Sequence, residues 1–360
     1  MPVPLFAASL DARREDIIVQ VTDVIRSGRF ILGPEVEAFE QEFAAYLGVR
    51  HCVGVANGTD AITIALRALG VRGGDEVVLP SLTFYATAEA VVNAGATPVF
   101  CDVDPATFCV TPETVRAAVT TRTRAVVPVH LFGNVAPVGQ LRELGVPVLE
   151  DAAQAAGATL AGRRAGALGE AATFSFFPSK NLGGLGDGGA VVTDDAEVAA
   201  TARRLRFHGS EDKQTHTEVG YNSRLDALQA AALRVLLPTL DQTNGARRAA
   251  AAAYAAQGLA EHAGLPEPGP EVEHVYHLYV VRHPEPDALA RRLAEQEVGA
   301  RGYYRVPVHR QPAMTRWAPA EGALPGTDEA ARTNLALPMG PELDSSDIAE
   351  VVAACASGST

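Results

Sequence analysis

Short apolar runs alternate with amphipathic, alanine-rich stretches through the first half of the chain. Most runs are almost continuously apolar, which is typical of strands buried on both faces of a largely parallel sheet. Helix-like stretches separate several of them, so the pattern predicts an α/β domain of three layers. The strands are expected at residues 51–56, 76–79, 97–101, 125–130, 147–150, 173–177 and 190–193, and the helices at 60–69, 83–94 and 111–119.

The pattern changes after residue 195. Helices are expected at 195–207, 223–237 and 243–258, with Pro238 interrupting between the last two. A Pro/Gly-rich linker at 265–270 precedes a strand at 275–281, a helix near 286–297 and a strand-like stretch near 301–304. Because 360 residues exceed what one core usually supports, we expect two domains. They are a large domain over 1–244 with an N-terminal helical segment, and a small α+β domain over 245–360.

Charge and composition exclude several classes of protein. The net charge of −13 argues against nucleic-acid binding through a basic surface. No apolar stretch is long enough to span a membrane, and no secretory leader is evident, so a cytoplasmic enzyme without membrane or nucleic-acid partners is expected. An anionic substrate then requires a local pocket of positive charge or backbone donors.

Lys180 and Asp151 carry the most specific chemistry. Lys180 follows an aromatic strand, where desolvation lowers a lysine pKa, as a Schiff base with pyridoxal phosphate requires. Asp151 follows the apolar run 147–150 and would pair with the pyridine nitrogen, while Gln154 would bond the phenolic oxygen. Taken alone, each has an ordinary alternative: a strand-end lysine for the first and a helix cap for the second.

A phosphate site and a ring cover are also expected. In Asn57-Gly58-Thr59-Asp60 a strand turns into a helix, where backbone amides and the Thr59 hydroxyl would bind phosphate. Ser175 would add a hydroxyl, and Phe84 would cover the ring of the cofactor. The alternatives are a simple helix cap by Thr59 and a core position for Phe84.

Two other motifs are judged misleading. Residues 184–189 match GxGxxG, but a strand follows them where a dinucleotide site requires a helix. We interpret them as a turn that allows backbone to pack near Lys180. His274 and His277 resemble a metal pair, but at the start of a strand their side chains would point to opposite faces.

Through these residues and further motifs, the chain resembles the DegT/StrS-type sugar aminotransferases. These are fold-type I, pyridoxal-phosphate-dependent enzymes with an aspartate-aminotransferase-like fold. The matching stretches follow the family's order. They are 33–36, 57–61, 73–77, 150–154, 174–180, 186–189 and 220–226.

The resemblance implies a role for each matching residue. Lys180 would attach the cofactor and move a proton, Asp151 and Gln154 would hold the ring, and Phe84 would stack on it. Gly58, Thr59, Asp60 and Ser175 would surround the phosphate. Asn222 resembles a residue that reaches the phosphate from the partner subunit, which implies a homodimer with composite active sites.

The resemblance also implies the reaction. A related dehydratase branch carries histidine in place of Lys180, so amino transfer is expected here. L-Glutamate would generate pyridoxamine phosphate, and a keto-sugar, most often nucleotide-linked and of the 3- or 4-keto-6-deoxyhexose type, would accept the amine. Tyr304 and His309 are candidate substrate contacts, and Arg224 would bind an anionic substrate or pair with Asp226.

Two further functions stay open at this point. One is a keto-inositol (cyclitol) aminotransferase of antibiotic biosynthesis, using the same residues. The other is a non-catalytic regulatory protein that binds pyridoxal phosphate on the same fold.

Overall fold

A central sheet of seven strands forms the larger part of the protein. The computed structural model describes residues 2–6 and 10–357. Two hydrogen-bonded groups, β1-β9-β8-β5 and β3-β2-β4, join through parallel bridges at Val126–Val148 and Val129–Asp151. Only β9 runs antiparallel to its neighbours, so the predicted, largely parallel sheet is confirmed. The strands are β1 (His51–Val55), β2 (Glu76–Pro80), β3 (Thr97–Cys101), β4 (Thr123–Val126), β5 (Leu149–Asp151), β8 (Ala171–Ser175) and β9 (Gly189–Thr193).

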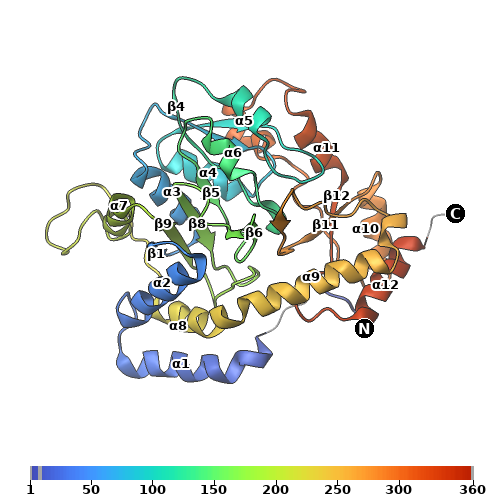
Figure 1. Ribbon diagram of the computed structural model, residues 1–360, viewed down its shortest axis with the longest axis horizontal. Coiled ribbons are helices and arrows are strands. Elements are labelled where there is room, and N and C mark those ends of the chain that lie inside the picture. Colours follow the sequence, from blue (N-terminus) through green and yellow to red (C-terminus); the bar gives the residue numbers. More distant parts are fainter. Residues whose placement is uncertain (1, 7–9, 358–360) are drawn as a thin grey trace.

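Helices cover both faces of this sheet, giving the three predicted layers (Figure 1). In β2, Val78 packs into the core on one face, while Val77 and Leu79 pack into the core on the other. This burial on both faces explains why the strands are apolar throughout. The first core contains α2 (Pro34–Leu47), α5 (Pro112–Ala118), α6 (Val138–Arg142) and α8 (Ala227–Leu236); the second contains α3 (Gly58–Ala68), α4 (Tyr85–Asn93) and α7 (Ala196–Arg206).

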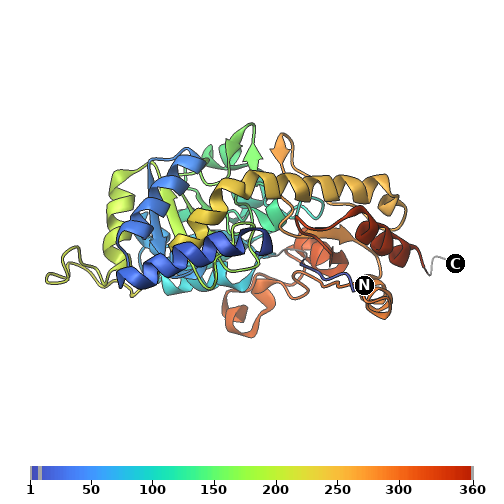
Figure 2. The same ribbon diagram turned by 90° about the horizontal axis from the view of Figure 1, so that it is seen from below.

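A separate core lies at the other end of the molecule. The helix α9 (Leu240–Ala256) runs from the large body to this second body, as Figures 1 and 2 show. Its core also contains Val3, whose backbone pairs with Val298. The first residues of the chain therefore pack with the C-terminal body, although the predicted division at residue 244 assigns them to the large domain. That domain boundary stays a prediction. The second body contains β11 (Tyr279–Arg282), β12 (Asn334–Leu337), α10 (Pro286–Glu295) and α12 (Ser345–Ala356).

The remaining elements lie around these two bodies. They are α1 (Arg14–Ser27), α11 (Pro325–Thr333) and a small sheet of β6 (Thr159–Leu160), β7 (Arg163–Arg164) and β10 (Val272–Glu273). Pro238 lies in a short 3-10 helix between α8 and α9, as the interruption predicted. Across the described residues, no helix is long and apolar enough to cross a membrane.

Two predicted strands are wrong in position or type. The strand expected at 275–281 begins only at Tyr279, because the chain turns at Tyr276 with φ +43°. The stretch 301–304 forms no strand; only Arg301 makes a bridge, to Ala336. The apolar and aromatic residues of these segments are packed in the fold but form almost no sheet hydrogen bonds. A run of apolar residues looks the same in the sequence in both cases.

Candidate active site

The carboxyl ends of β5 and β8 and the amino ends of α3 and α4 meet around one cavity of about 870 Å³. This edge is where open α/β sheets bind ligands. Residues 301–306 of the second body line the same cavity, so both bodies contribute to it. Of the predicted site residues, the following line it: Gly58, Thr59, Phe84, Asp151, Gln154, Ser175, Lys180 and Tyr304.

Lys180 lies in the turn that follows β8. Its backbone N–H donates to the carbonyl oxygen of Phe177 at 2.8 Å, and its half-buried side chain lines the cavity. Burial lowers the pKa of the amine to about 8, although the charge of Asp151 opposes this shift. Near pH 7, about a tenth of such an amine is neutral, so Lys180 is able to act as a nucleophile and to move protons.

Asp151 ends β5 with a buried carboxylate. Its Oδ2 accepts a hydrogen bond from the Thr87 hydroxyl at 2.8 Å, and its Oδ1 accepts one from the Ala153 amide at 3.2 Å. Burial raises the pKa of this carboxyl, and these hydrogen bonds and the charge of Lys180 oppose the rise. Among the described residues no cation donates a hydrogen bond to Asp151, so its remaining lone pairs are available to a cationic donor in the cavity.

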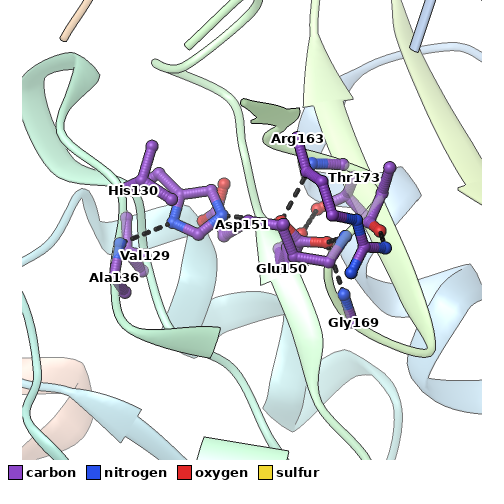
Figure 3. Close-up of polar contacts among 12 residues, drawn as sticks. Val129, His130, Ala136, Glu150, Asp151, Arg163, Gly169 and Thr173 are labelled. Carbon is purple, nitrogen blue, oxygen red and sulfur yellow. Dashed lines mark hydrogen bonds and ion pairs between the residues drawn. The ribbon is translucent and has the colours of Figure 1, made fainter. Parts of the chain in front are cut away.

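A second buried carboxylate, that of Glu150, precedes Asp151 in β5 and anchors this strand. Its side chain accepts from His130 Nε2 at 2.8 Å and from the amides of Gly166, Leu168 and Gly169 at 2.8–2.9 Å (Figure 3). Burial alone would raise the pKa of Glu150, but these donors outweigh burial and lower it. In turn, His130 Nδ1 accepts from the Ala136 amide at 3.1 Å. Glu150 thereby fixes both β5 and the 166–169 turn.

The turn at 57–60 has the geometry of an anion site. Asn57, rather than Thr59, caps α3, by accepting from the Asp60 amide at 2.8 Å. This leaves the Thr59 hydroxyl to the cavity. A Cβ on Gly58 would lie 2.8 Å from the Cβ of Ser175, so only glycine allows this close approach. Asp60 does not line the cavity, although its amide belongs to the helix start.

Gln154, Tyr304 and Phe84 form one wall of the cavity. Gln154 Oε1 accepts from the Phe132 amide at 2.7 Å, and its Nε2 donates to the Tyr304 hydroxyl at 3.3 Å. One proton of this amide therefore stays available to an acceptor in the cavity. The Phe84 side chain is 56% exposed and its ring centroid lies 6.0 Å from that of Tyr304. An apolar ring exposed inside a cavity is suited to cover a planar ligand.

Besides Asp60, three predicted residues do not line this cavity. The His309 ring is buried and hydrogen bonds to the Ser81 hydroxyl, so in this geometry it does not contact a substrate. Asn222 is exposed and pairs through its backbone with Phe207. Arg224 does not pair with Asp226; its guanidinium carbon lies 5.9 Å from the centroid of the Phe207 ring.

The two misleading motifs also have clear positions. The glycine-rich residues form a turn leading into β9, as predicted, and a Cβ on Gly183 would lie 2.4 Å from the carbonyl oxygen of Pro178, next to Lys180. His274 and His277 do not begin a strand. His274 Nδ1 accepts from the Tyr276 amide, and His277 Nδ1 contacts Asn181 Oδ1 at 3.2 Å. Among the described residues, no group of His, Cys, Asp or Glu side chains is arranged to hold a metal.

Sequence reasoning missed two contributors, Thr87 and Arg301. Thr87 lies 64 residues before Asp151 in the chain, so no local pattern connects them. Its only signal is its place in the first turn of a helix that follows a buried strand. Arg301 is fixed through its backbone to Ala336 of β12 by hydrogen bonds of 3.2 and 2.8 Å and lines the cavity with an exposed side chain.

These contacts fit pyridoxal phosphate. A buried carboxylate without a cationic hydrogen-bond partner suits a protonated pyridine nitrogen, and a half-buried amine of lowered pKa suits attachment of the aldehyde. The helix start at Gly58 offers backbone amides to the phosphate. The fold and the cavity therefore define a pyridoxal-phosphate-dependent transferase.

Comparison with known proteins narrows this class. Residues 11–356 match the DegT/DnrJ/EryC1/StrS aminotransferase family. A dTDP-3-amino-3,4,6-trideoxy-alpha-D-glucose transaminase from Streptomyces venezuelae is 47% identical, over 94% of this chain and 90% of that protein. A pleiotropic regulatory protein from Geobacillus stearothermophilus is 46% identical, over 95% of each chain.

A solved structure agrees closely with the fold. The crystal structure of S. venezuelae DesV in complex with a ketimine intermediate has a TM-score of 0.95 and 45% identity, covering 98% of this chain and 97% of that one. The chain belongs to the DegT/DnrJ/EryC1/StrS aminotransferase family. It is an aminotransferase of fold type I, and its cofactor is pyridoxal phosphate.

Proposed function

We propose that this aminotransferase moves an amino group from L-glutamate to C3 of a nucleotide-linked 3-keto sugar. The observation that carries the amino transfer is the single cavity shared by Lys180, Asp151 and Gln154. The sugar and the C3 position are supported by the 47% identity to a transaminase whose product is a dTDP-linked 3-amino sugar. Such a substrate belongs to deoxyaminosugar biosynthesis, and a cytoplasmic location stays a prediction.

Each residue of the cavity then has a stated task. When bound, the cofactor supplies an electron sink that stabilises negative charge on the substrate carbon. Asp151 would hold the ring nitrogen, the free proton of Gln154 Nε2 would bind the phenolic oxygen, and Phe84 would cover the ring. Lys180 Nζ, with its pKa lowered to about 8, takes up and returns a proton near neutral pH.

The phosphate would lie at the start of α3. Backbone amides at Gly58 and Thr59 would donate to it, and the hydroxyls of Thr59 and Ser175 would add two further donors. The Asp60 side chain lies outside the cavity, so only its helix position would contribute. Binding of phosphate would fix the cofactor at one end while Asp151 fixes it at the other.

Arg301 is the proposed anion contact for both substrates. Unlike Arg305, which pairs with Asp287 at 3.2 Å, Arg301 has no carboxylate partner among the described residues. Glutamate and a sugar nucleotide are both anions, and in a protein of net charge −13 they require a local positive group. We expect Arg301→Gln to raise the KM for both substrates, with Tyr304 contacting the sugar beside it.

We also propose a homodimer with composite sites. Asn222 is exposed and does not line the cavity of its own subunit. Both properties are expected of a residue that contacts the cofactor of the partner subunit. Large apolar side chains are exposed on nearby segments; Ile31, for example, is bridged to Asp226. These exposed side chains are Ile18, Val19, Ile25, Phe30, Ile31, Phe177, Leu185 and Val219. Association would remove them from water.

A mixing experiment tests the composite site. Lys180→Ala and Asn222→Ala variants are each expected to be nearly inactive, because each lacks one part of every site. In a mixed dimer one site is complete, so a refolded equal mixture should regain about a quarter of wild-type activity. No recovery, although an affinity tag on one variant captures the untagged other variant in mixed dimers, would contradict the role of Asn222.

The substrate class is tested with a panel of acceptors. The holoenzyme is given L-glutamate with a 3-keto sugar nucleotide, a 4-keto sugar nucleotide or a keto-inositol, and the aminated product is measured by mass spectrometry. The proposal expects the 3-keto sugar nucleotide to be aminated fastest. Turnover of keto-inositols alone would instead support a cyclitol aminotransferase, and bound cofactor without any turnover would support a regulatory protein.

A further inference from the structure

Two threonines at the amino end of α4 form a chain of hydroxyls that ends on Asp151. Thr83 and Thr87 are 2% and 1% exposed, and their hydroxyl oxygens lie 3.0 Å apart. Thr87 Oγ1 lies 2.8 Å from Asp151 Oδ2. All three residues line the active-site cavity. The chain of contacts therefore reaches from one wall of the cavity to the carboxylate proposed to hold the cofactor.

The direction of these hydrogen bonds follows from the number of protons. An ionised carboxylate only accepts, so the one hydroxyl proton of Thr87 points to Asp151. The contact between the two hydroxyls then requires Thr83 to donate to Thr87. Each donor strengthens the next one in such a chain. A hydrogen bond to a charged carboxylate is stronger than one to a neutral carboxyl, so the chain favours the ionised Asp151.

We propose that Thr83 and Thr87 are positioning residues that, as a hydroxyl relay, hold Asp151 ionised and oriented to bind the pyridine nitrogen of the cofactor. The proposal rests on the proposed role of Asp151. Thr83 lies in the bend before α4 and Thr87 in the first turn of that helix, so the turn into α4 brings the two hydroxyls together.

Other groups around Asp151 do not replace the relay. The charge of Lys180, from the turn after β8, acts on Asp151 without a hydrogen bond to it. His130, from the segment after β4, directs its ring N–H to Glu150 instead. Thr87 is the only side chain in the described part of the protein that donates to this carboxylate; the other donor is the Ala153 amide. Burial raises the pKa of Asp151, and the hydrogen bond from Thr87 is the largest effect that opposes the rise.

The test measures binding of pyridoxal phosphate to full-length protein stripped of its cofactor. Thr87→Val keeps the shape of the side chain without the hydroxyl and should raise the Kd about tenfold. Thr87→Ser keeps the hydroxyl and should stay within about threefold of wild type, and Thr83→Val should raise the Kd by about threefold. The control is Thr193→Val, which removes another buried, hydrogen-bonded hydroxyl outside the cavity and should leave the Kd unchanged.

The pH dependence of binding separates the relay from a merely structural effect. Without the Thr87 hydroxyl the pKa of Asp151 rises further, so affinity should decline on acidification at a pH up to about one unit higher than in wild type. An unchanged Kd and pH profile in Thr87→Val would overturn the relay, as would equal losses in Thr87→Val and Thr87→Ser. An unchanged Kd in Asp151→Asn would instead overturn the proposed role of Asp151.

Discussion

Replacing Glu150 with glutamine tests how the buried carboxylate beside the active site stabilises the fold. Each of its two oxygens accepts two hydrogen bonds at 2.8–2.9 Å, from His130 Nε2 and three backbone amides. In Glu150→Gln, one oxygen becomes an NH₂ group that faces two donors, so two hydrogen bonds are lost. Bonds to a charged acceptor contribute about 1.5–3 kcal/mol each, so the expected loss is about 3–6 kcal/mol.

Thermal unfolding of the cofactor-free protein measures this loss. Unfolding entropy of about 2.1 cal/mol/K per residue gives about 0.75 kcal/mol per kelvin for 360 residues. The Tm should therefore fall by about 4–8 °C at pH 7. Because folding lowers the pKa of Glu150, its contribution is present above about pH 5 and lost as the pH falls further, so the difference between the proteins should shrink in acid.

A matched control separates burial from charge. Glu42 forms an ion pair with Arg234 at 2.8 Å, but its side chain is 41% exposed. Glu42→Gln should therefore cost less than about 1 kcal/mol and lower the Tm by little more than 1 °C. A Tm for Glu150→Gln within 2 °C of wild type would refute the reasoning, because it would mean that the four donors do not depend on a carboxylate acceptor.

Three further predictions follow from the geometry. Gly58→Ala places a Cβ 2.8 Å from the Cβ of Ser175 and should weaken cofactor binding about tenfold. The control is Gly245→Ala in α9, where the nearest atom to the added Cβ is the flexible end of Arg248 at 3.8 Å; it should leave binding unchanged. Attachment of pyridoxal phosphate to Lys180 should accelerate with pH and level off above about pH 8, measured by stopped-flow absorbance; an inflection near 10.5 would contradict the burial of the amine. Gly133→Ala, at φ +100° and with a Cβ 2.8 Å from the Tyr276 amide, should lower the Tm by about 1–4 °C, because the strain costs about 1–3 kcal/mol. An unchanged Tm would argue against close packing of these segments.

The parts of the fold that sequence predicted are those with local signals. Apolar runs located all seven strands of the central sheet, because burial on both faces leaves a continuous mark on the sequence. Lys180 and Asp151 were found because each follows such a strand, and both line the cavity. The 57–60 turn was located too, but its cap was not: Asn57 caps the helix, which leaves the Thr59 hydroxyl to the cavity.

Contacts between distant residues were not predictable in this way. Thr87 meets Asp151 across 64 residues, and the orientation of His309 is fixed by Ser81, 228 residues earlier. His309 therefore does not line the cavity, although Val308 and Gln311 do. The packing of Val3 in the second body was not predictable either, because its partner Val298 is close to it only in the folded chain.

Transfer of labelled nitrogen tests the central claim most directly. The holoenzyme is incubated with L-[¹⁵N]glutamate and a nucleotide-linked 3-keto sugar, and the product is analysed by mass spectrometry and NMR. The account predicts ¹⁵N on C3 of the sugar with wild-type protein and, because Lys180 Nζ moves the proton, almost none with Lys180→Ala. Label on no sugar, or equal labelling by the two proteins, would contradict it.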